Sequence, residues 1–104
     1  MAAAPPYVSY STCTVGSIPA ESWPAVYSSM QSLKGHVQEY PGCQKLEAFV
    51  HAEAEGAVRI HCYTTWDTPE QLETYLERGY TFERMLVDIA GVRPETLMPL
   101  EKIF

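Results

Sequence analysis

Basic residues are scarce in this 104-residue sequence: seven Lys and Arg stand against thirteen Asp and Glu, a formal net charge of −6. Nucleic-acid binding depends largely on clustered Lys and Arg that contact phosphates, so an acidic chain argues against such a partner. Anionic membrane surfaces are disfavoured for the same reason. The charge balance therefore predicts a protein that binds neither nucleic acid nor membrane.

Long apolar runs are also missing. No segment approaches the roughly 18 apolar residues that a membrane-spanning helix needs, and the start MAAAPPY lacks the basic residues and apolar run of a secretory signal. The three cysteines are an odd number without Cys-x-x-Cys spacing, which fits a reducing compartment. We therefore expect a cytoplasmic protein.

Motifs for cofactors and metals are absent as well. The six glycines are scattered, so there is no phosphate-binding loop, and no serine sits in a Gly-x-Ser-x-Gly turn. His51 and His61 are candidate metal ligands, but no third ligand is evident beside them. We expect no cofactor and no metal. Without repeats or linkers, residues 1–104 form one domain, with residues 1–6 expected to be flexible.

Hydrophobic periodicity predicts the order β-α-β-β-α-β. β-forming residues at Tyr7–Val15 predict a first strand, which Gly16, Ser17 and Pro19 close. Ser22 is the expected N-cap of a first helix, which ends at YPGC (40–43). Its apolar stripe recurs at steps of three and four, at Trp23, Val26, Tyr27, Met30, Leu33 and Val37.

Two alternating segments predict a hairpin, with strands at Gln44–Ala52 and Val58–Trp66. The loop EAEG joins them, with Gly56 at a position of positive φ. Pairing of the aliphatic faces sets Val50 opposite Ile60, which places Phe49 beside His61 and Glu47 beside Tyr63.

A second helical region begins with a capping box, Thr68-Pro69-Glu70-Gln71. Gly79 interrupts its apolar stripe, which predicts either a kink or a short turn. Thr96–Phe104 is the last predicted strand, and Pro99 favours an edge position or a bulge.

This order predicts an α+β fold of ferredoxin-like type, with both helices on one face of an antiparallel sheet. The other face would carry aromatic, acidic and histidine side chains, too aromatic to be fully hydrated. A second copy stacked on this face would cover it, so we expect a homodimer formed through the sheet faces.

The segments YPGCQKLEAF and YTTWDTPEQLETYL, in this topology and length, resemble the antibiotic-biosynthesis monooxygenase family of dimeric α+β barrels, over residues 41–86. The resemblance implies kinship with cofactor-free oxygenases of polyketide quinols and anthrones, and with enzymes that cleave haem. The haem-cleaving relatives use an Asn, a Trp and a His. Trp66 matches the Trp, but Tyr75 stands for the His, and Ser11 or Ser9 stands where the Asn is expected, which disfavours haem degradation.

The candidate site lies on the helix-covered face. Trp66 shares a face with Val58, Ile60 and Cys62, and Tyr75 shares the stripe of Leu72, so these aromatics form a wall for a flat aromatic molecule. Alternatively, Trp66 simply fills the core. Tyr75 and Ser11, or Ser9, would orient substrate oxygens.

A catalytic base is the least defined part of the site. Histidine is the usual candidate because its pKa lies near neutral pH. His61 is the candidate here, although its strand parity directs it away from Trp66. His36 is expected on a hydrated helix face, and His51 in a charge pair with Glu53 or Glu55.

The sequence thus predicts a cofactor-independent monooxygenase of a flat aromatic or quinol-like molecule. A non-catalytic module that binds a hydrophobic metabolite is the alternative, and a haem-degrading relative is a weaker third.

Overall fold

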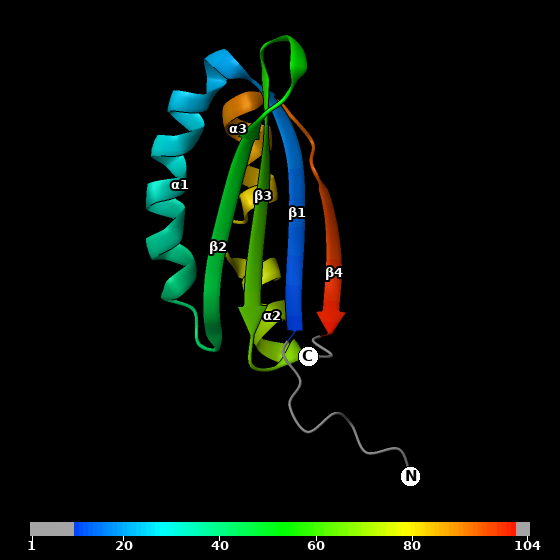
Figure 1. Cartoon of the computed structure of the whole chain (residues 1–104). Coiled ribbons are helices and arrows are strands. Elements are labelled where there is room, and N and C mark those ends of the chain that lie inside the picture. The colour runs from blue at the N-terminus through cyan, green and yellow to red at the C-terminus, as the bar shows by residue number, and fades with distance from the viewer. Residues whose placement is uncertain (1–9, 102–104) are drawn as a thin grey trace.

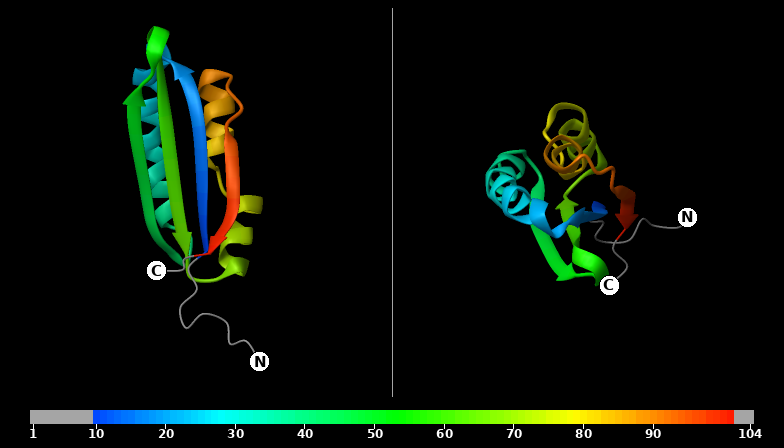
Figure 2. Two further views of the ribbon diagram at one scale, coloured as in Figure 1. Left: turned by 45° about the vertical axis from the view of Figure 1, so that its right-hand side comes forward. Right: turned by 90° about the horizontal axis from the view of Figure 1, so that it is seen from above.

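The computed structural model describes residues 10–101, which form a four-stranded antiparallel sheet with helices on one face (Figures 1 and 2). The predicted ferredoxin-like α+β fold is confirmed, with the strand order β2-β3-β1-β4. Along the chain the elements are β1 (Tyr10–Pro19), α1 (Trp23–Gln38), β2 (Cys43–Ala52), β3 (Ala57–Trp66), α2 (Pro69–Arg78), α3 (Phe82–Ala90) and β4 (Glu95–Glu101).

The predicted hairpin register is confirmed. Val50 lies opposite Ile60, Phe49 opposite His61 and Glu47 opposite Tyr63. The loop turns at Gly56 with φ of 75°. Because this register follows from matching the aliphatic faces of two adjacent strands, local sequence was sufficient to define it.

The first strand is longer than predicted: it continues through Gly16 and Ser17 and ends at Pro19, so the prediction that Gly16 and Ser17 close it is wrong. The pairing with β3 extends from Tyr10 to Pro19. A Cβ at Gly16 would lie 2.8 Å from Leu86 Cδ1 and 3.2 Å from Pro94 Cβ. The glycine therefore serves close packing of β1 against α3 and the segment that follows it, rather than a turn.

The start of α1 also differs from the prediction. A 3₁₀ turn, η1 (Ala20–Ser22), runs directly into the helix, and Ser22 has near-helical φ and ψ of −83° and −12°. The Ser22 side chain makes no capping hydrogen bond, so the predicted N-cap is wrong in its chemistry. Pro24 lies in the first turn, as expected.

The second helical region is two helices joined by a short turn at residues 79–81, one of the two predicted possibilities. Thr68 caps α2 by accepting the Gln71 backbone N–H (3.2 Å), and Gln71 Oε1 accepts the Thr68 hydroxyl (3.1 Å). Thr81 caps α3 by accepting the Arg84 N–H (3.2 Å). Each helix thus has its own start signal, so the break at Gly79 separates two complete elements.

The last strand begins at Glu95 and lies at a sheet edge, as predicted from Pro99. Its pairing with β1 shifts register between Ser11 and Cys13, opposite Leu100 and Leu97. The predicted end of this strand at residues 102–104, like the start of the first strand and the predicted flexible residues 1–6, lies outside the described residues.

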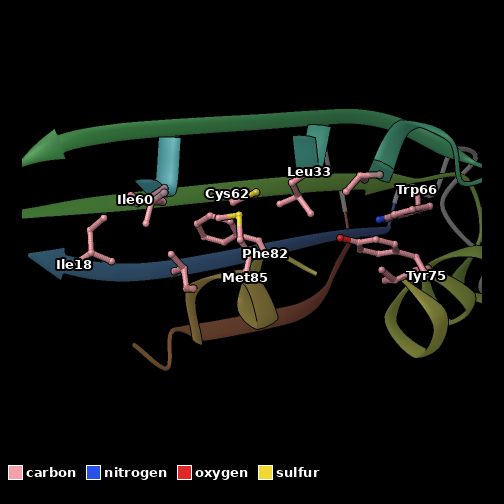
Figure 3. Packing of buried hydrophobic residues seen from close by; sticks show 12 residues of the cluster. Ile18, Leu33, Ile60, Cys62, Trp66, Tyr75, Phe82 and Met85 are labelled. Carbon is pink, nitrogen blue, oxygen red and sulfur yellow. The ribbon is translucent and has the colours of Figure 1, made fainter. Parts of the chain in front are cut away.

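The core fills the space between the helices and one face of the sheet (Figure 3). Its largest fully buried side chains include Trp66, Ile60, Met85 and Leu86. The opposite, helix-free face leaves Phe49 57% and Leu97 59% exposed. Between residues 10 and 101, no helix has the length and hydropathy to span a membrane.

Candidate functional site

Trp66 and Tyr75, the aromatic residues predicted to line a pocket, lie against each other. Trp66 ends β3 and Tyr75 belongs to α2, and their rings stack with centroids 5.0 Å apart and an interplanar angle of 25° (Figure 3). Trp66 is fully buried, and its indole N–H donates to Thr64 Oγ1 (2.9 Å). Leu72 is buried in the same cluster. The Tyr75 phenol thus covers the indole, and a ligand would have to displace it to stack there.

The Tyr75 hydroxyl is held at the joint between α2 and α3. It donates to the Tyr80 carbonyl (3.0 Å). Burial, and secondarily the neighbouring Cys62, raise the pKa of this phenol above its ordinary value of about 10. Such a phenol stays protonated at neutral pH, so Tyr75 can orient a bound oxygen but is a poor base.

The same joint is fixed by contacts from α1 and α3. The Tyr80 N–H donates to His36 Nε2 (2.9 Å), and Arg84 Nη1 donates to the Gly79 carbonyl (3.1 Å). His36, expected on a hydrated helix face, is half-buried and links α1 to the joint. The backbone groups of Gly79 and Tyr80 at the helix break are therefore paired, which makes the break a defined structure.

A small cavity between the sheet and this joint is lined by hydroxyl groups. Thr12 and Thr14 of β1 and Thr64 of β3 border it, together with Tyr75, and its volume is about 40 Å³. Thr12 Oγ1 and Thr64 Oγ1 are hydrogen-bonded at 2.5 Å. The space suits about one molecule the size of water.

The carboxylate of Glu83, on α3, is connected to this cavity through two threonine hydroxyls. Thr14 Oγ1 and Thr96 Oγ1 lie 3.0 Å apart, and the Thr96 hydroxyl donates to Glu83 Oε2 (3.1 Å). Because Thr96 uses its hydrogen on Glu83, Thr14 must be the donor in the first bond. The two threonines thus form a directed chain from the cavity wall to a half-buried carboxylate, and Glu83 itself borders the cavity.

A larger apolar groove lies beside this cavity, between α1 and β2. Its volume is about 310 Å³, and Trp23 and Tyr27 of α1 stand on one side of it. Leu33, Leu46 and Cys62 border both the groove and the small cavity. The two hollows are therefore neighbours separated by a thin wall of side chains, of which Leu33 and Cys62 are shown in Figure 3.

The structure does not bring Ser11 to Tyr75. Side chains alternate along β1, so Thr12 and Thr14 face the helices while Ser11 lies on the helix-free face. There Ser11 Oγ is 3.2 Å from Thr65 Oγ1. The predicted joint action of Ser11 and Tyr75 on one substrate therefore lacks the required geometry, and Ser9 lies outside the described residues.

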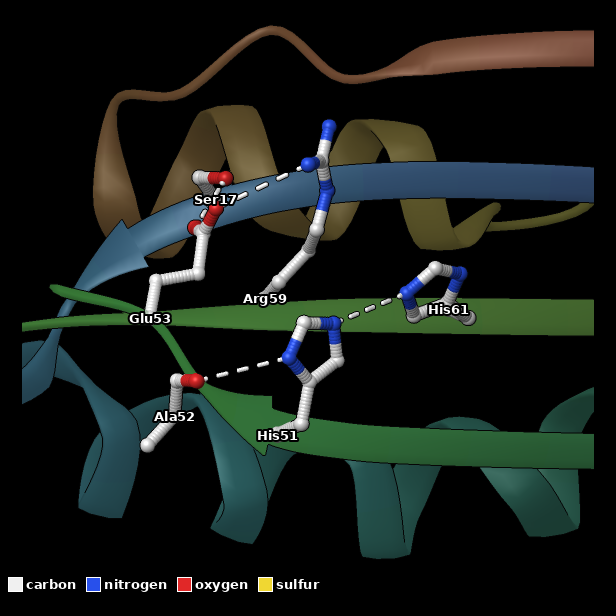
Figure 4. Close-up of polar contacts among 6 residues, drawn as sticks. All are labelled: Ser17, His51, Ala52, Glu53, Arg59 and His61. Atoms are coloured by element: carbon white, nitrogen blue, oxygen red, sulfur yellow. Dashed lines mark hydrogen bonds and ion pairs between the residues drawn. The ribbon is translucent and has the colours of Figure 1, made fainter.

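His61 also lies on the helix-free face, the side expected from its parity. Its Nε2 is 3.3 Å from His51 Nε2, and the two imidazoles stack with centroids 5.4 Å apart (Figure 4). The expected charge pair of His51 with Glu53 is replaced by another: Glu53 pairs with Arg59 at 3.6 Å and accepts the Ser17 hydroxyl. His61 is thus across the sheet from Trp66 and Tyr75.

Sequence reasoning missed the threonines of the cavity and Glu83. A partial signal was present in Thr64, which shares strand parity with Trp66 and Cys62. Thr12 and Thr14 lie beside Thr64 only because β1 pairs with β3 in this register. These two strands are far apart in the sequence, so no short turn defines that register. Among residues 10–101, no three His, Cys, Asp or Glu side chains are grouped as a metal site would require.

The fold has counterparts among solved structures, whereas no family model and no curated protein sequence matches the chain. A candidate antibiotic biosynthesis monooxygenase from Nitrosomonas europaea has a TM-score of 0.73 at 12% identity and covers 92% of this chain and 91% of its own. A protein of unknown function from Bacteroides thetaiotaomicron, described as a possible oxidoreductase, has a TM-score of 0.63 at 15% identity, and the match covers 88% of this chain and 97% of that protein. A haem-degrading protein from Mycobacterium tuberculosis has a TM-score of 0.55 at 15% identity, and the match covers 86% of this chain and 90% of that protein.

These similarities confirm, at the level of the fold, the resemblance that the sequence segments carried. The N. europaea structure matches over nearly the full length of both chains. The chain therefore shares its fold with this candidate monooxygenase.

Proposed function

We propose that the protein is a cofactor-independent monooxygenase that oxidises a flat aromatic or quinol-like molecule with O₂. One observation carries this proposal: an apolar groove of about 310 Å³ adjoins a hydroxyl-lined cavity of about 40 Å³, across Leu33, Leu46 and Cys62. The groove has the volume of a small-molecule site. The cavity has room for a diatomic molecule such as O₂. The fold shared with a candidate monooxygenase supports the same assignment.

The reaction requires removal of a proton before electrons pass to O₂. With an anthrone as substrate, a methylene becomes a carbonyl: two C–H bonds break, one oxygen atom forms the new C=O bond, and the other leaves as water. In this proposal the side chains of the shared wall, Leu33, Leu46 and Cys62, move apart so that the reacting carbon meets Thr14. Thr14 accepts the first proton as it passes its own to Thr96, and Thr96 passes one to Glu83, along the hydrogen bonds of 3.0 and 3.1 Å. Tyr75 stays protonated and gives its hydrogen to the Tyr80 carbonyl, so its oxygen orients the substrate by accepting a hydrogen bond from a substrate hydroxyl.

Oxygen uptake by the purified protein tests this proposal, with a panel of anthrones and hydroquinones that includes carboxylated members. Protein-dependent uptake is expected, and Thr14→Val should lower its rate at least about tenfold, because it removes the hydroxyl of the relay at nearly constant volume. Thr74→Val is the matched control, since Thr74 is exposed on α2 and bonds only the Glu70 carbonyl among the described residues. Equal rates in both variants would contradict the relay, and no uptake with any compound would contradict the oxygenase.

A non-catalytic binder of a hydrophobic metabolite is the second candidate. The groove favours it, because an apolar hollow of this size binds a ligand whether or not chemistry follows. A binder would show a raised melting temperature with some of the same compounds and no oxygen uptake. The two candidates thus separate in one pair of measurements.

Haem does not fit the residues present. The position where haem-cleaving relatives have a histidine is Tyr75, whose hydroxyl donates to the Tyr80 carbonyl and whose ring covers Trp66. Ser11, at the place expected for the Asn, lies on the opposite face of the sheet. We therefore assign no haem chemistry to this chain.

A further inference from the structure

The groove between α1 and β2 has an uneven composition that bears on its ligand. The α1 side carries Trp23, Tyr27, Met30, Gln31 and Lys34, and the β2 side carries Leu46, Ala48 and Val50. Tyr27 and Val50 are 53% and 46% exposed, although both are large apolar residues. Exposed apolar surface gathered around a hollow, rather than scattered singly, is typical of a binding site.

The charge of the groove is opposite to that of the chain. The protein carries thirteen acidic residues and a net charge of −6, yet no Asp or Glu lines the groove. Lys34 is its one charged residue, and Gln31 lies one helical turn before it, so both present N–H donors along the same side. Within residues 10–101, Lys34 makes no ion pair. The groove is therefore a local site of positive charge on an acidic surface.

We propose that this groove binds the apolar, aromatic body of an organic anion, with a carboxylate or sulfonate paired to Lys34. The assignment of this ligand as the substrate rests on the proposed function; the binding site itself does not. The far end of the bound molecule lies at Leu33 and Cys62, the wall shared with the hydroxyl-lined cavity. The substrate class is thus an aromatic acid. Its charged end pairs with Lys34, and its reacting end lies at the opposite end of the groove, beside the hydroxyl-lined cavity.

Two fluorescent probes that differ in charge test the site. The anion is 1-anilinonaphthalene-8-sulfonate, and N-phenyl-1-naphthylamine is its neutral counterpart. Lys34→Gln should weaken binding of the anionic probe roughly fivefold, since it removes one partly solvated ion pair, and should leave binding of the neutral probe unchanged. Ala48→Phe should weaken both probes, because it fills the groove from an exposed strand position without disturbing the core.

Lys45→Gln is the matched control, since Lys45 is exposed on β2 but does not line the groove. Equal weakening of the anion by Lys34→Gln and Lys45→Gln would overturn the proposal, as would normal binding of both probes to Ala48→Phe. If the probes behave as expected but no compound supports oxygen uptake, the proposed function fails while the site stands. Oxygen uptake that Ala48→Phe leaves unchanged would show that the substrate binds elsewhere.

Discussion

Cys62 is buried in the core, on the wall between the groove and the cavity. Burial, and to a lesser extent the nearby Cys13, raise the pKa of its thiol from 9.0 to about 12. A thiol that must stay protonated in the folded state, while it ionises freely in the unfolded state, links stability to alkaline pH.

We predict that the free energy of unfolding falls between pH 9 and 12. The folded-state pKa lies above the unfolded value, so the contribution of Cys62 is complete below pH 9 and is lost as pH rises toward 12. The slope for one proton is about 1.4 kcal/mol per pH unit. Urea unfolding across this range measures it, and Cys62→Ala should reduce the slope. An unchanged slope in Cys62→Ala would contradict the assignment.

At Tyr75, we predict that removal of the hydroxyl affects both stability and turnover. Tyr75→Phe leaves the Tyr80 carbonyl without its donor and should lower the free energy of unfolding by about 1 kcal/mol. Under the proposed function it should also slow oxygen uptake more than it weakens ligand binding. Urea unfolding and oxygen uptake on the same preparations check this, and a purely structural role would leave the rate per folded molecule unchanged.

Among the elements, the α2–α3 joint depends on a glycine for steric reasons. A Cβ at Gly79 would overlap the ring of Tyr75, which is itself stacked on Trp66. The φ of Gly79 is −86°, so the requirement is space rather than a left-handed backbone. Gly35, in α1, has no atom within 4 Å of the position of an added Cβ.

We predict opposite effects for the same substitution at these two glycines. Gly79→Ala should lower the free energy of unfolding by about 2 kcal/mol, because Tyr75 must move. Gly35→Ala should raise it by about 0.5–1 kcal/mol through helix propensity. Thermal or urea unfolding of the pair checks this, and similar changes in both variants would show that the joint is not tightly packed.

The sequence predicted the elements well where local rules applied. The β2–β3 register followed from two adjacent alternating strands, and the start of α2 followed from Thr68 and Gln71. Gly16 was misread as a strand end because its close contact with Leu86 joins distant segments. Such contacts arise only when the helices pack on the sheet, and a single sequence carries no local signal for them.

The candidate site was less predictable for a related reason. The first strand consists largely of Ser, Thr and Cys, whose similar polarity gives no contrast between its two faces. The face of Ser11 could be assigned only through the long-range pairing with β3. The groove likewise depends on where α1 crosses β2, which periodicity within each element does not define.

At the scale of the whole molecule, the helix-free face of the sheet exposes apolar side chains that no other part of the described chain covers. Phe49 and Tyr63 pack edge to face there with centroids 6.0 Å apart, and Leu97 and Leu100 remain 59% and 38% exposed. Apolar residues gathered on one sheet face are typical of an interface. We expect a second copy of the chain to cover them.

We predict that light scattering gives a mass twice the 11.7 kDa of the chain. Phe49→Lys should shift the mass toward 11.7 kDa, because it would place an unpaired charge in an apolar interface. Val87→Lys is the control, since Val87 is 41% exposed on α3, away from this face. A wild-type mass of 11.7 kDa at micromolar concentration would contradict the dimer.

The most direct test of monooxygenation is the fate of labelled oxygen. The purified protein would be incubated under ¹⁸O₂ with the anthrone that gives the fastest uptake, and the product analysed by mass spectrometry. We predict one ¹⁸O atom in each product molecule, formed at the same rate in metal-free buffer and at least about tenfold more slowly in Thr14→Val. A product without label, or one that carries both oxygen atoms, would contradict a monooxygenase built on the groove and its adjoining cavity.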